Sequence, residues 1–236
     1  MAEIQVAQGM IAAYWNRVSA AYDDAPDHRL RGAAEHAAWL DLLRGIVPQA
    51  PARILDLGTG TGFLALLLAE LGHEVLGIDI AEGMVAIARQ KAAGLPVPPR
   101  FMVGDAGAPP VDAASVDVVV NRHLLWTLPD PLGALHNWHR ALRPGGLLVV
   151  IDGLWAVGEE TGTADTPAES VDETYAAYYT PEVEGQLPLL GARSTDRVVT
   201  LIEEAGFGGL RDLSLAPLER AQHRLHPGNF ILTARS

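Results

Sequence analysis

Three glycines alternate with threonines at Gly58, Gly60 and Gly62, directly after the short apolar run 53–57. Glycine lets the backbone turn tightly and approach a ligand closely. The following run, 63–71, is rich in leucine and alanine and predicts a helix, whose first N–H groups have no partners within the helix itself. A strand that enters a helix through such a turn is typical of a site for a nucleotide-like ligand.

The spacing of the glycines leaves two classes of cofactor open. The dinucleotide fingerprint G-x-G-x-x-G/A fails when it is counted from Gly58, because Phe63 occupies the sixth position. Counted from Gly60, the pattern is completed by Ala65, so the glycines alone do not exclude NAD. An NAD(P)-dependent oxidoreductase therefore stays an alternative to any other function inferred from this turn.

Carboxylates stand at the ends of the strands predicted around the turn. Asp56 precedes the glycines, Asp79 lies near the end of the run 74–80, and Asp105 follows the run 100–103. Ligands of open α/β sheets bind at the carboxyl ends of the strands, where a carboxylate can accept from ribose hydroxyls or an adenine amine. Each aspartate could instead be a helix cap or a turn residue.

These motifs together resemble the class I S-adenosylmethionine-dependent methyltransferases of the small-molecule type. The resemblance covers about residues 50–152 and includes Asp-x-Gly-x-Gly-x-Gly at 56–62, Asn-Arg-His-Leu-Leu-Trp at 121–126 and Arg-Pro-Gly-Gly at 143–146. It implies S-adenosylmethionine as the cofactor and methyl transfer to a small organic molecule at N, O or C. The residues that it implies for cofactor binding are Tyr14, Tyr22, Asp56, Gly58, Gly60, Gly62, Asp79, Ile80, Met84, Asp105, Ala106 and Asn121.

The resemblance also implies a role for each part of this set. Asp56 and the glycines would line the methionine portion of the cofactor, and Asp79 would hold the ribose hydroxyls. Asp105 would hold the adenine edge. Asn121 would lie beside the amino-acid end, over which tyrosines of the N-terminal segment would close.

Two residues are the main candidates for a general base. Methyl transfer from a sulfonium is an in-line displacement that mainly requires alignment and exclusion of water, and a base helps when the acceptor carries a proton. His123 follows the predicted strand 116–121, and Asp152 follows the predicted strand 147–151. The histidine could instead be a packing residue and the aspartate a cap or turn residue. Further candidates, better explained as residues of a solvated loop, are His223 and His226.

Aromatic side chains gather in segments that should lie above the sheet. Such rings suit a planar or apolar substrate, and they could equally pack these segments onto the core. One residue can do both. The candidates for substrate contact are Trp15, Trp126, Trp155, Tyr175, Tyr178 and Tyr179.

Strand and helix patterns alternate through most of the chain, which predicts an α/β fold. We expect a Rossmann-like, doubly wound, mostly parallel sheet of seven strands, whose antiparallel last strand is inserted beside the sixth. The strands are expected at 53–57, 74–80, 100–103, 116–121, 147–151, 209–215 and 229–234, with no helix between the last two.

One methyltransferase domain is expected to include the whole chain, 1–236. Its parts are a helical N-terminal lid at 1–47, a cofactor-binding core at 48–152, a cap insertion at 153–195 and a C-terminal part of the core at 196–236.

Composition narrows the classes of partner. The 236 residues carry 29 acidic and 17 basic side chains, a formal charge of −12, which disfavours nucleic acid and anionic membranes. Cysteine is absent, which excludes disulfides, thiol catalysis and cysteine-bound metals. No dense cluster of Asp, Glu and His suggests a catalytic metal, so we expect metal-independent chemistry. No run approaches about 18 apolar residues and no secretory signal opens the sequence, so a cytoplasmic protein is expected.

The acidic excess is concentrated in one part of the chain. Ten acidic residues fall between Asp152 and Asp196 inclusive, where Arg193 is the single base. This segment could be a solvated lid, or it could attract a cationic acceptor.

The finer function stays open at this level. We expect a small-molecule substrate and a role in secondary metabolism. A protein acceptor and a non-catalytic module that binds the cofactor are alternatives. A homodimer is one of the oligomeric states that the sequence allows.

Overall fold

A computed structural model describes residues 2–25, 28–155, 168–221 and 228–236, and its strands form one seven-stranded sheet. The strand order is β3-β2-β1-β4-β5-β7-β6; β1 to β5 run parallel, and β7 is antiparallel to both of its neighbours. The predicted fold class is therefore confirmed, including the insertion of the last strand beside the sixth. The strands are β1 Arg53–Leu57, β2 Glu74–Asp79, β3 Arg100–Val103, β4 Val116–Arg122, β5 Leu142–Asp152, β6 Gly208–Leu213 and β7 Phe230–Arg235.

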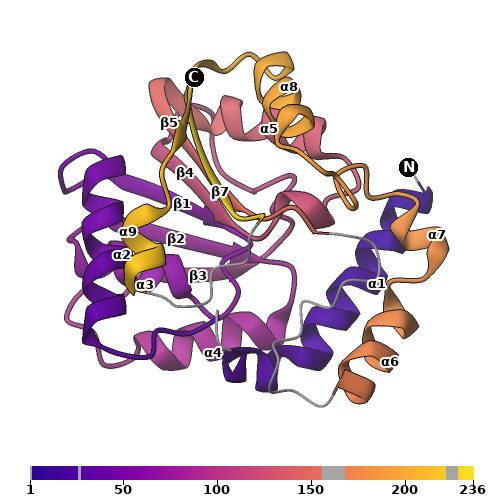
Figure 1. The fold of residues 1–236 in the computed structure, drawn as a ribbon. Helices are drawn as coiled ribbons and strands as arrows, with labels where there is room; N and C mark the ends of the chain where they lie inside the picture. Colours follow the sequence, from indigo (N-terminus) through magenta and orange to yellow (C-terminus); the bar gives the residue numbers. More distant parts are fainter. Residues whose placement is uncertain (1, 26–27, 156–167, 222–227) are drawn as a thin grey trace.

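Both faces of the sheet are covered by helices, which lie on either side of it in Figure 1. Central strand β4 shows the consequence in its sequence: Val118 and Val120 pack on one face, Val119 packs on the other, and all three are fully buried. A strand buried on both faces is a continuous apolar run and does not alternate. One face is covered by α2 Ala33–Ile46, α3 Phe63–Glu70, α4 Glu82–Ala92 and α9 Ala216–Ala221, and the other by α5 Pro131–Ala141 and α8 Asp196–Glu204.

Helix α5 illustrates how local sequence sets the boundary of an element. The Asp130 carboxylate accepts a hydrogen bond from the Gly133 N–H at 2.9 Å, and Pro131 occupies the first turn, where its missing N–H is not needed. The buried stripe of this helix includes Leu135 and Trp138, which are both fully buried against the sheet. The cap and the stripe together fix where α5 begins and which side faces the core.

Segments from distant parts of the sequence form a third layer beside the sheet. Helices α1 Ala2–Val18, α6 Ala168–Tyr178 and α7 Pro181–Glu184 lie together in Figure 1, and their apolar side chains form one cluster. With the 3₁₀ helix η1 Ser19–Asp24, we call these elements the cover. The predicted lid at 1–47 is divided in the structure, because Trp39 and Leu43 of α2 pack on the sheet and not in the cover.

The structure corrects two details of the expected strand and helix pattern. Helix α9 lies between β6 and β7, where we expected no helix. Strand β5 begins at Leu142, five residues before the predicted start at Leu147, and its pairing with β4 shifts register between Val116 and Val118. The Arg-Pro-Gly-Gly motif therefore lies inside an irregular strand, because an irregularity in the pairing accommodates proline and glycine that a regular central strand would exclude.

We expect Trp138 to be essential for stability, because it joins α5 to the strand-end loop after β3. Its indole N–H donates to the Ala106 carbonyl at 2.7 Å, and its ring is fully buried. Trp138→Ala should lower the free energy of unfolding by about 3–5 kcal/mol in urea denaturation. Trp138→Phe should lose less, about 1–3 kcal/mol, because mainly the hydrogen bond is removed. The control Val97→Ala, at a side chain 68 % exposed, should stay within about 0.5 kcal/mol of the parent, and equal effects at both positions would show that Trp138 has no such role.

Candidate cofactor and substrate site

An open cavity lies where strand ends of the sheet meet the cover, with about 700 Å³ of empty space including its mouth. Its walls come from residues at or after the ends of β1, β2, β3 and β4 and from α1 and η1. The structure thus brings together side chains that are up to about 120 residues apart in sequence, as open α/β sheets do at their carboxyl edge. The predicted site residues that line the cavity are Trp15, Tyr22, Gly58, Gly60, Asp79, Ile80, Met84, Asp105, Ala106 and His123.

The glycine turn forms the floor of this cavity. Gly58 has φ +65°, and a Cβ atom there would lie 2.8 Å from the Cδ1 atom of Leu124. Gly60 has φ +55°, and its N–H donates to the Asp79 carboxylate at 2.8 Å. Side chains at these positions would strain the backbone or displace a neighbour, which is why the turn requires glycine.

Asp56 holds the glycine turn in place through hydrogen bonds. The carboxylate is buried, and its Oδ2 atom accepts from the Thr59 hydroxyl at 2.6 Å and from the Ala65 N–H at 3.1 Å. Burial raises its pKa to about 7. Asp56 and Gly62, which caps α3, do not line the cavity, contrary to our expectation that they line the methionine portion. Asp56 instead joins the end of β1 to the start of α3.

Two carboxylates face the cavity from the neighbouring strands. Asp79 accepts from Gly60 and from the Ala81 N–H at 2.9 Å, and burial raises its pKa. Asp105 accepts from the Gly107 N–H at 2.7 Å and from the Gln8 amide at 3.1 Å. A carboxylate has about four acceptor positions, so both retain capacity for hydroxyl or amine groups of a ligand.

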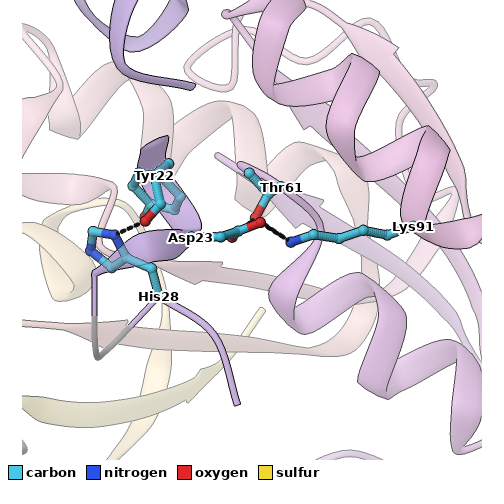
Figure 2. A network of polar contacts seen from close by, with 5 residues as sticks. All are labelled: Tyr22, Asp23, His28, Thr61 and Lys91. Atoms are coloured by element: carbon cyan, nitrogen blue, oxygen red, sulfur yellow. Dashed lines mark hydrogen bonds and ion pairs between the residues drawn. The ribbon is translucent and has the colours of Figure 1, made fainter. Parts of the chain in front are cut away.

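The N-terminal segment is attached to the core next to the glycine turn. Figure 2 shows Asp23 between Thr61 and Lys91: the Thr61 hydroxyl donates to it at 2.7 Å, and the lysine ammonium lies 2.5 Å from it. Tyr22 lines the cavity, and His28 stacks on its ring at 3.9 Å and contacts its carbonyl at 2.8 Å. Burial is the main cause that lowers the pKa of His28 to about 4, so this ring is neutral near pH 7.

Arg122 is a cavity residue that sequence reasoning missed. It ends β4 and lies in the Asn-Arg-His motif, between two residues that we did single out. Its guanidinium lies 4.3 Å from the centre of the Phe63 ring and 5.7 Å from that of Trp39. The signal that could have found it was its position at the end of a central strand. Other unpredicted residues of the lining are Gln8, Ile11, Leu124, Thr127, Leu128 and Pro129.

The two candidate bases have different surroundings. His123 lines the cavity with φ +54°, and its ring lies 5.1 Å from the Trp155 ring. Asp152 does not line the cavity and is buried, and its oxygens accept from the N–H groups of Leu125 and Gly153, both at 2.8 Å, and from the Trp155 indole at 3.0 Å. Asp152 thus holds the strand end and the following loop in place, and its role as a base stays a prediction. The role of His123 stays a prediction.

The aromatic candidates mostly pack against one another. Tyr14, Tyr179 and Trp126 are buried, and Tyr179 stacks on Tyr175 at 4.4 Å and on Trp126 at 5.7 Å. Of the six rings proposed for substrate contact, Trp15 lines the cavity; the others join the cover to the core, and Tyr14, proposed for the cofactor, lies among them. Tyr179 still reaches the cavity wall indirectly, because its hydroxyl lies 2.7 Å from that of Thr127. The rings that do not line the cavity are Trp126, Trp155, Tyr175, Tyr178 and Tyr179.

Three remaining expectations stay predictions. Asn121 is fully buried at the end of β4 without lining the cavity, and its amide has no hydrogen-bond partner among the described residues. His223 and His226 lie outside the described residues. Within the described ranges no three His, Asp or Glu side chains gather as metal ligands, and none of the helices is long and apolar enough to cross a membrane. Metal-independent chemistry stays a prediction.

Comparison with known proteins agrees with this geometry. Residues 55–150, which include the glycine turn and the ends of β2 to β4, match a family model described as a methyltransferase domain. This part of the chain is therefore similar to the methyltransferase domain family. Among solved structures, it is similar to an S-adenosylmethionine-dependent methyltransferase from Mesorhizobium loti, with a TM-score of 0.59 and 22 % identity over 86 % of this chain and 100 % of that one. That likeness supports the fold.

Two curated methyltransferases are similar to part of this sequence. A demethylmenaquinone methyltransferase from Thermus thermophilus is 45 % identical over 106 residues, which are 44 % of this chain and 48 % of the relative. A ubiquinone biosynthesis O-methyltransferase from Ruegeria pomeroyi is 39 % identical over 104 residues, 43 % of this chain and 41 % of the relative. The matches therefore span less than half the length of either relative.

The pKa of Asp152 leads to a prediction about stability and pH. Burial raises this pKa from 3.8 to about 6, so the folded protein binds the proton more tightly than the unfolded chain. Its contribution to the free energy of unfolding should therefore rise as the pH falls from about 6 toward 4, by roughly 3 kcal/mol in all. The side chain at position 152 cannot titrate in Asp152→Asn. As the pH falls from 8 to 5, the free energy of unfolding of the wild type, measured by urea denaturation, should therefore rise relative to that of this variant.

The control for this measurement is Asp112→Asn, at an exposed aspartate, which should follow the wild type at every pH. If the free energies of unfolding of the wild type and Asp152→Asn differ by the same amount at every pH, the raised pKa of Asp152 is contradicted.

Lys91 should hold the N-terminal segment against the core. Lys91→Met removes its contacts with Asp23 and with the Thr61 hydroxyl, which it reaches at 2.9 Å. Because both charged side chains are partly exposed, the free energy of unfolding should fall by no more than about 1 kcal/mol. Hydrogen exchange of the backbone amides of η1 should nevertheless become faster, while that of β4 stays unchanged. Lys91→Arg is the matched control, and unchanged exchange in η1 of the Met variant would show that the ion pair does not hold this segment.

Proposed function

We propose that this protein transfers the methyl group of S-adenosylmethionine to a small organic acceptor. The observation that carries the proposal is the convergence of the glycine turn, Asp79 and Asp105 on one cavity, within residues that match a methyltransferase domain model. Because the matched relatives are only partly covered, activity and acceptor rest on the argument from the site. The chemistry that the cofactor supplies when bound is an activated methyl group on a sulfonium.

The residues of the cavity suit this cofactor. The Asp79 carboxylate faces the cavity and keeps acceptor capacity for a ribose hydroxyl, and Ile80 and Met84 offer apolar contact for the adenine ring. Asp105 can accept from the adenine amine, and its bond to Gln8 would then be shared or exchanged. The amide of Asn121 is buried without lining the cavity, so its place beside the amino-acid end of the cofactor stays a prediction.

The alternative of an NAD(P)-dependent oxidoreductase has less support. The dinucleotide fingerprint fits only when it is counted from Gly60. In the structure β1 ends at Leu57 and Gly58 makes the first step of the turn, so that count begins two residues late. The match to the methyltransferase family also favours the sulfonium cofactor.

The chain's own residues have three tasks in this reaction. The strand ends and the glycine turn hold the cofactor, and the cover excludes water from the reacting groups. His123 lines the cavity and is the residue that we propose to accept a proton from an acceptor hydroxyl or amine. Asp152 is a positioning residue for His123, because the hydrogen bond that it accepts from the Leu125 N–H holds the loop that carries His123.

We propose a planar ring compound as the acceptor. The cavity lining includes Trp15 and the apolar side chains of Leu124, Leu128 and Pro129, which suit the face of a ring. The names of the relatives from Thermus thermophilus and Ruegeria pomeroyi refer to quinone biosynthesis, which supports an acceptor of quinone type. The predicted place in secondary metabolism stays a prediction, as does the cytoplasmic location.

Calorimetry with S-adenosylhomocysteine and NAD⁺ tests the proposed cofactor. The wild type should bind S-adenosylhomocysteine and not NAD⁺. Asp79→Ala should weaken that binding by about 10–100-fold, because hydrogen bonds to a charged group are removed. Glu82→Ala removes a carboxylate from the exposed first residue of α4 and is the matched control, which should bind as the wild type does. Binding of NAD⁺ in place of S-adenosylhomocysteine would overturn the proposal.

A further inference from the structure

The charges around the cavity follow the order of the strands. In the sheet order β3-β2-β1-β4, Asp105 follows β3, Asp79 ends β2, the glycine turn follows β1, and Arg122 ends β4. The two acidic groups thus lie on one side of the turn and the guanidinium on the other. Among the described residues of the lining, Arg122 carries the one permanent positive charge.

S-adenosylmethionine has a matching order of groups. Its adenine and ribose are at one end, the sulfonium is in the middle, and an amino acid with a carboxylate is at the other end. If Asp105 and Asp79 receive adenine and ribose, as the proposed function requires, the amino-acid end extends past the glycine turn toward β4. The residue with a complementary charge at that end is Arg122.

Neighbouring rings restrict where the guanidinium can lie. It is placed over Phe63, the first residue of α3, with Trp39 on a second side. A guanidinium packed on aromatic faces loses less freedom when it pairs with a carboxylate, and its planar donors suit two carboxylate oxygens at once. The aromatic contacts therefore prepare Arg122 for an anionic ligand beside the glycine turn.

The charge of Arg122 acts on three groups near the glycine turn and the N-terminal segment. It acts to lower the pKa of Tyr22, His28 and Asp56, although burial is the largest influence on all three groups. His28 is neutral near pH 7 and adds no second positive charge there. Arg122 is thus the source of positive charge for a ligand carboxylate at this position.

We propose that Arg122 binds the carboxylate of the amino-acid portion of S-adenosylmethionine, an inference that rests on the proposed function. Arg122 would then make the site selective for ligands that keep this amino acid. 5′-Methylthioadenosine provides the comparison, because it has the adenine, ribose and sulfur of the cofactor but lacks the carboxylate.

Calorimetry with both ligands tests the proposal. Arg122→Gln should weaken binding of S-adenosylhomocysteine by about 10–100-fold and leave binding of 5′-methylthioadenosine within about threefold of the wild type. Arg122→Lys keeps the charge but lacks the planar pair of donors. Its affinity for S-adenosylhomocysteine should lie between those of the wild type and of Arg122→Gln. Raising the salt concentration should weaken S-adenosylhomocysteine binding more in the wild type than in Arg122→Gln.

A matched control separates this role from the general loss of a positive charge. Arg100 opens β3, at the opposite end of that strand from the cavity, so Arg100→Gln should leave both affinities unchanged. If Arg122→Gln loses affinity for both ligands equally, Arg122 only supports the fold. If Arg122→Gln binds S-adenosylhomocysteine as tightly as the wild type does, the proposal is also overturned. If the wild type itself binds 5′-methylthioadenosine but not S-adenosylhomocysteine, Arg122 does not bind the carboxylate; if it binds neither, the proposed function fails first.

Discussion

The geometry of the cavity depends on the hydrogen bonds that the buried carboxylate of Asp56 accepts. It joins the end of β1 to the start of α3 through Thr59 and Ala65 and so sets the path of the glycine turn between them. The turn then directs the Gly60 N–H at Asp79 and leaves room for Leu124 against Gly58. A carboxylate buried without such donors would be strongly disfavoured, so the turn and the aspartate stabilise each other.

The walls of the cavity come from both the strand ends of the sheet and the cover. Residues of α1 and η1 contact the core at the loop after β3, through Gln8 and Asp105, and at α4, through Asn16 and Gly83 and through Asp23 and Lys91. A Cβ atom on Gly83 would lie 2.5 Å from the Ser19 hydroxyl, so α1 and η1 approach α4 closely there. These polar attachments add to the apolar cluster in which Tyr14 and Tyr179 of the cover region pack with Trp126.

Much of the fold and part of the site could be predicted from residues close in sequence. The apolar runs, the glycine turn and the strand-end aspartates are local patterns, and they led to the sheet, to Asp79 and to Asp105. The surroundings of Asp152 could not be predicted, because a strand-end carboxylate looks the same in sequence whether it faces a cavity or accepts from its own loop. The short helix α9 was missed because six residues carry too little periodicity to distinguish a helix from a loop.

The sequence by itself determined the seven strands and the placement of acidic groups at strand ends, because these follow from periodicity and from turn-forming residues. Only the tertiary structure decided which side chains share the cavity. It buried Tyr14, Trp126 and Tyr179 in the joint between cover and core, and it placed Arg122 opposite the two aspartates. The physical reason is that these contacts depend on strand order and on the packing of distant segments, which no local pattern of residues encodes.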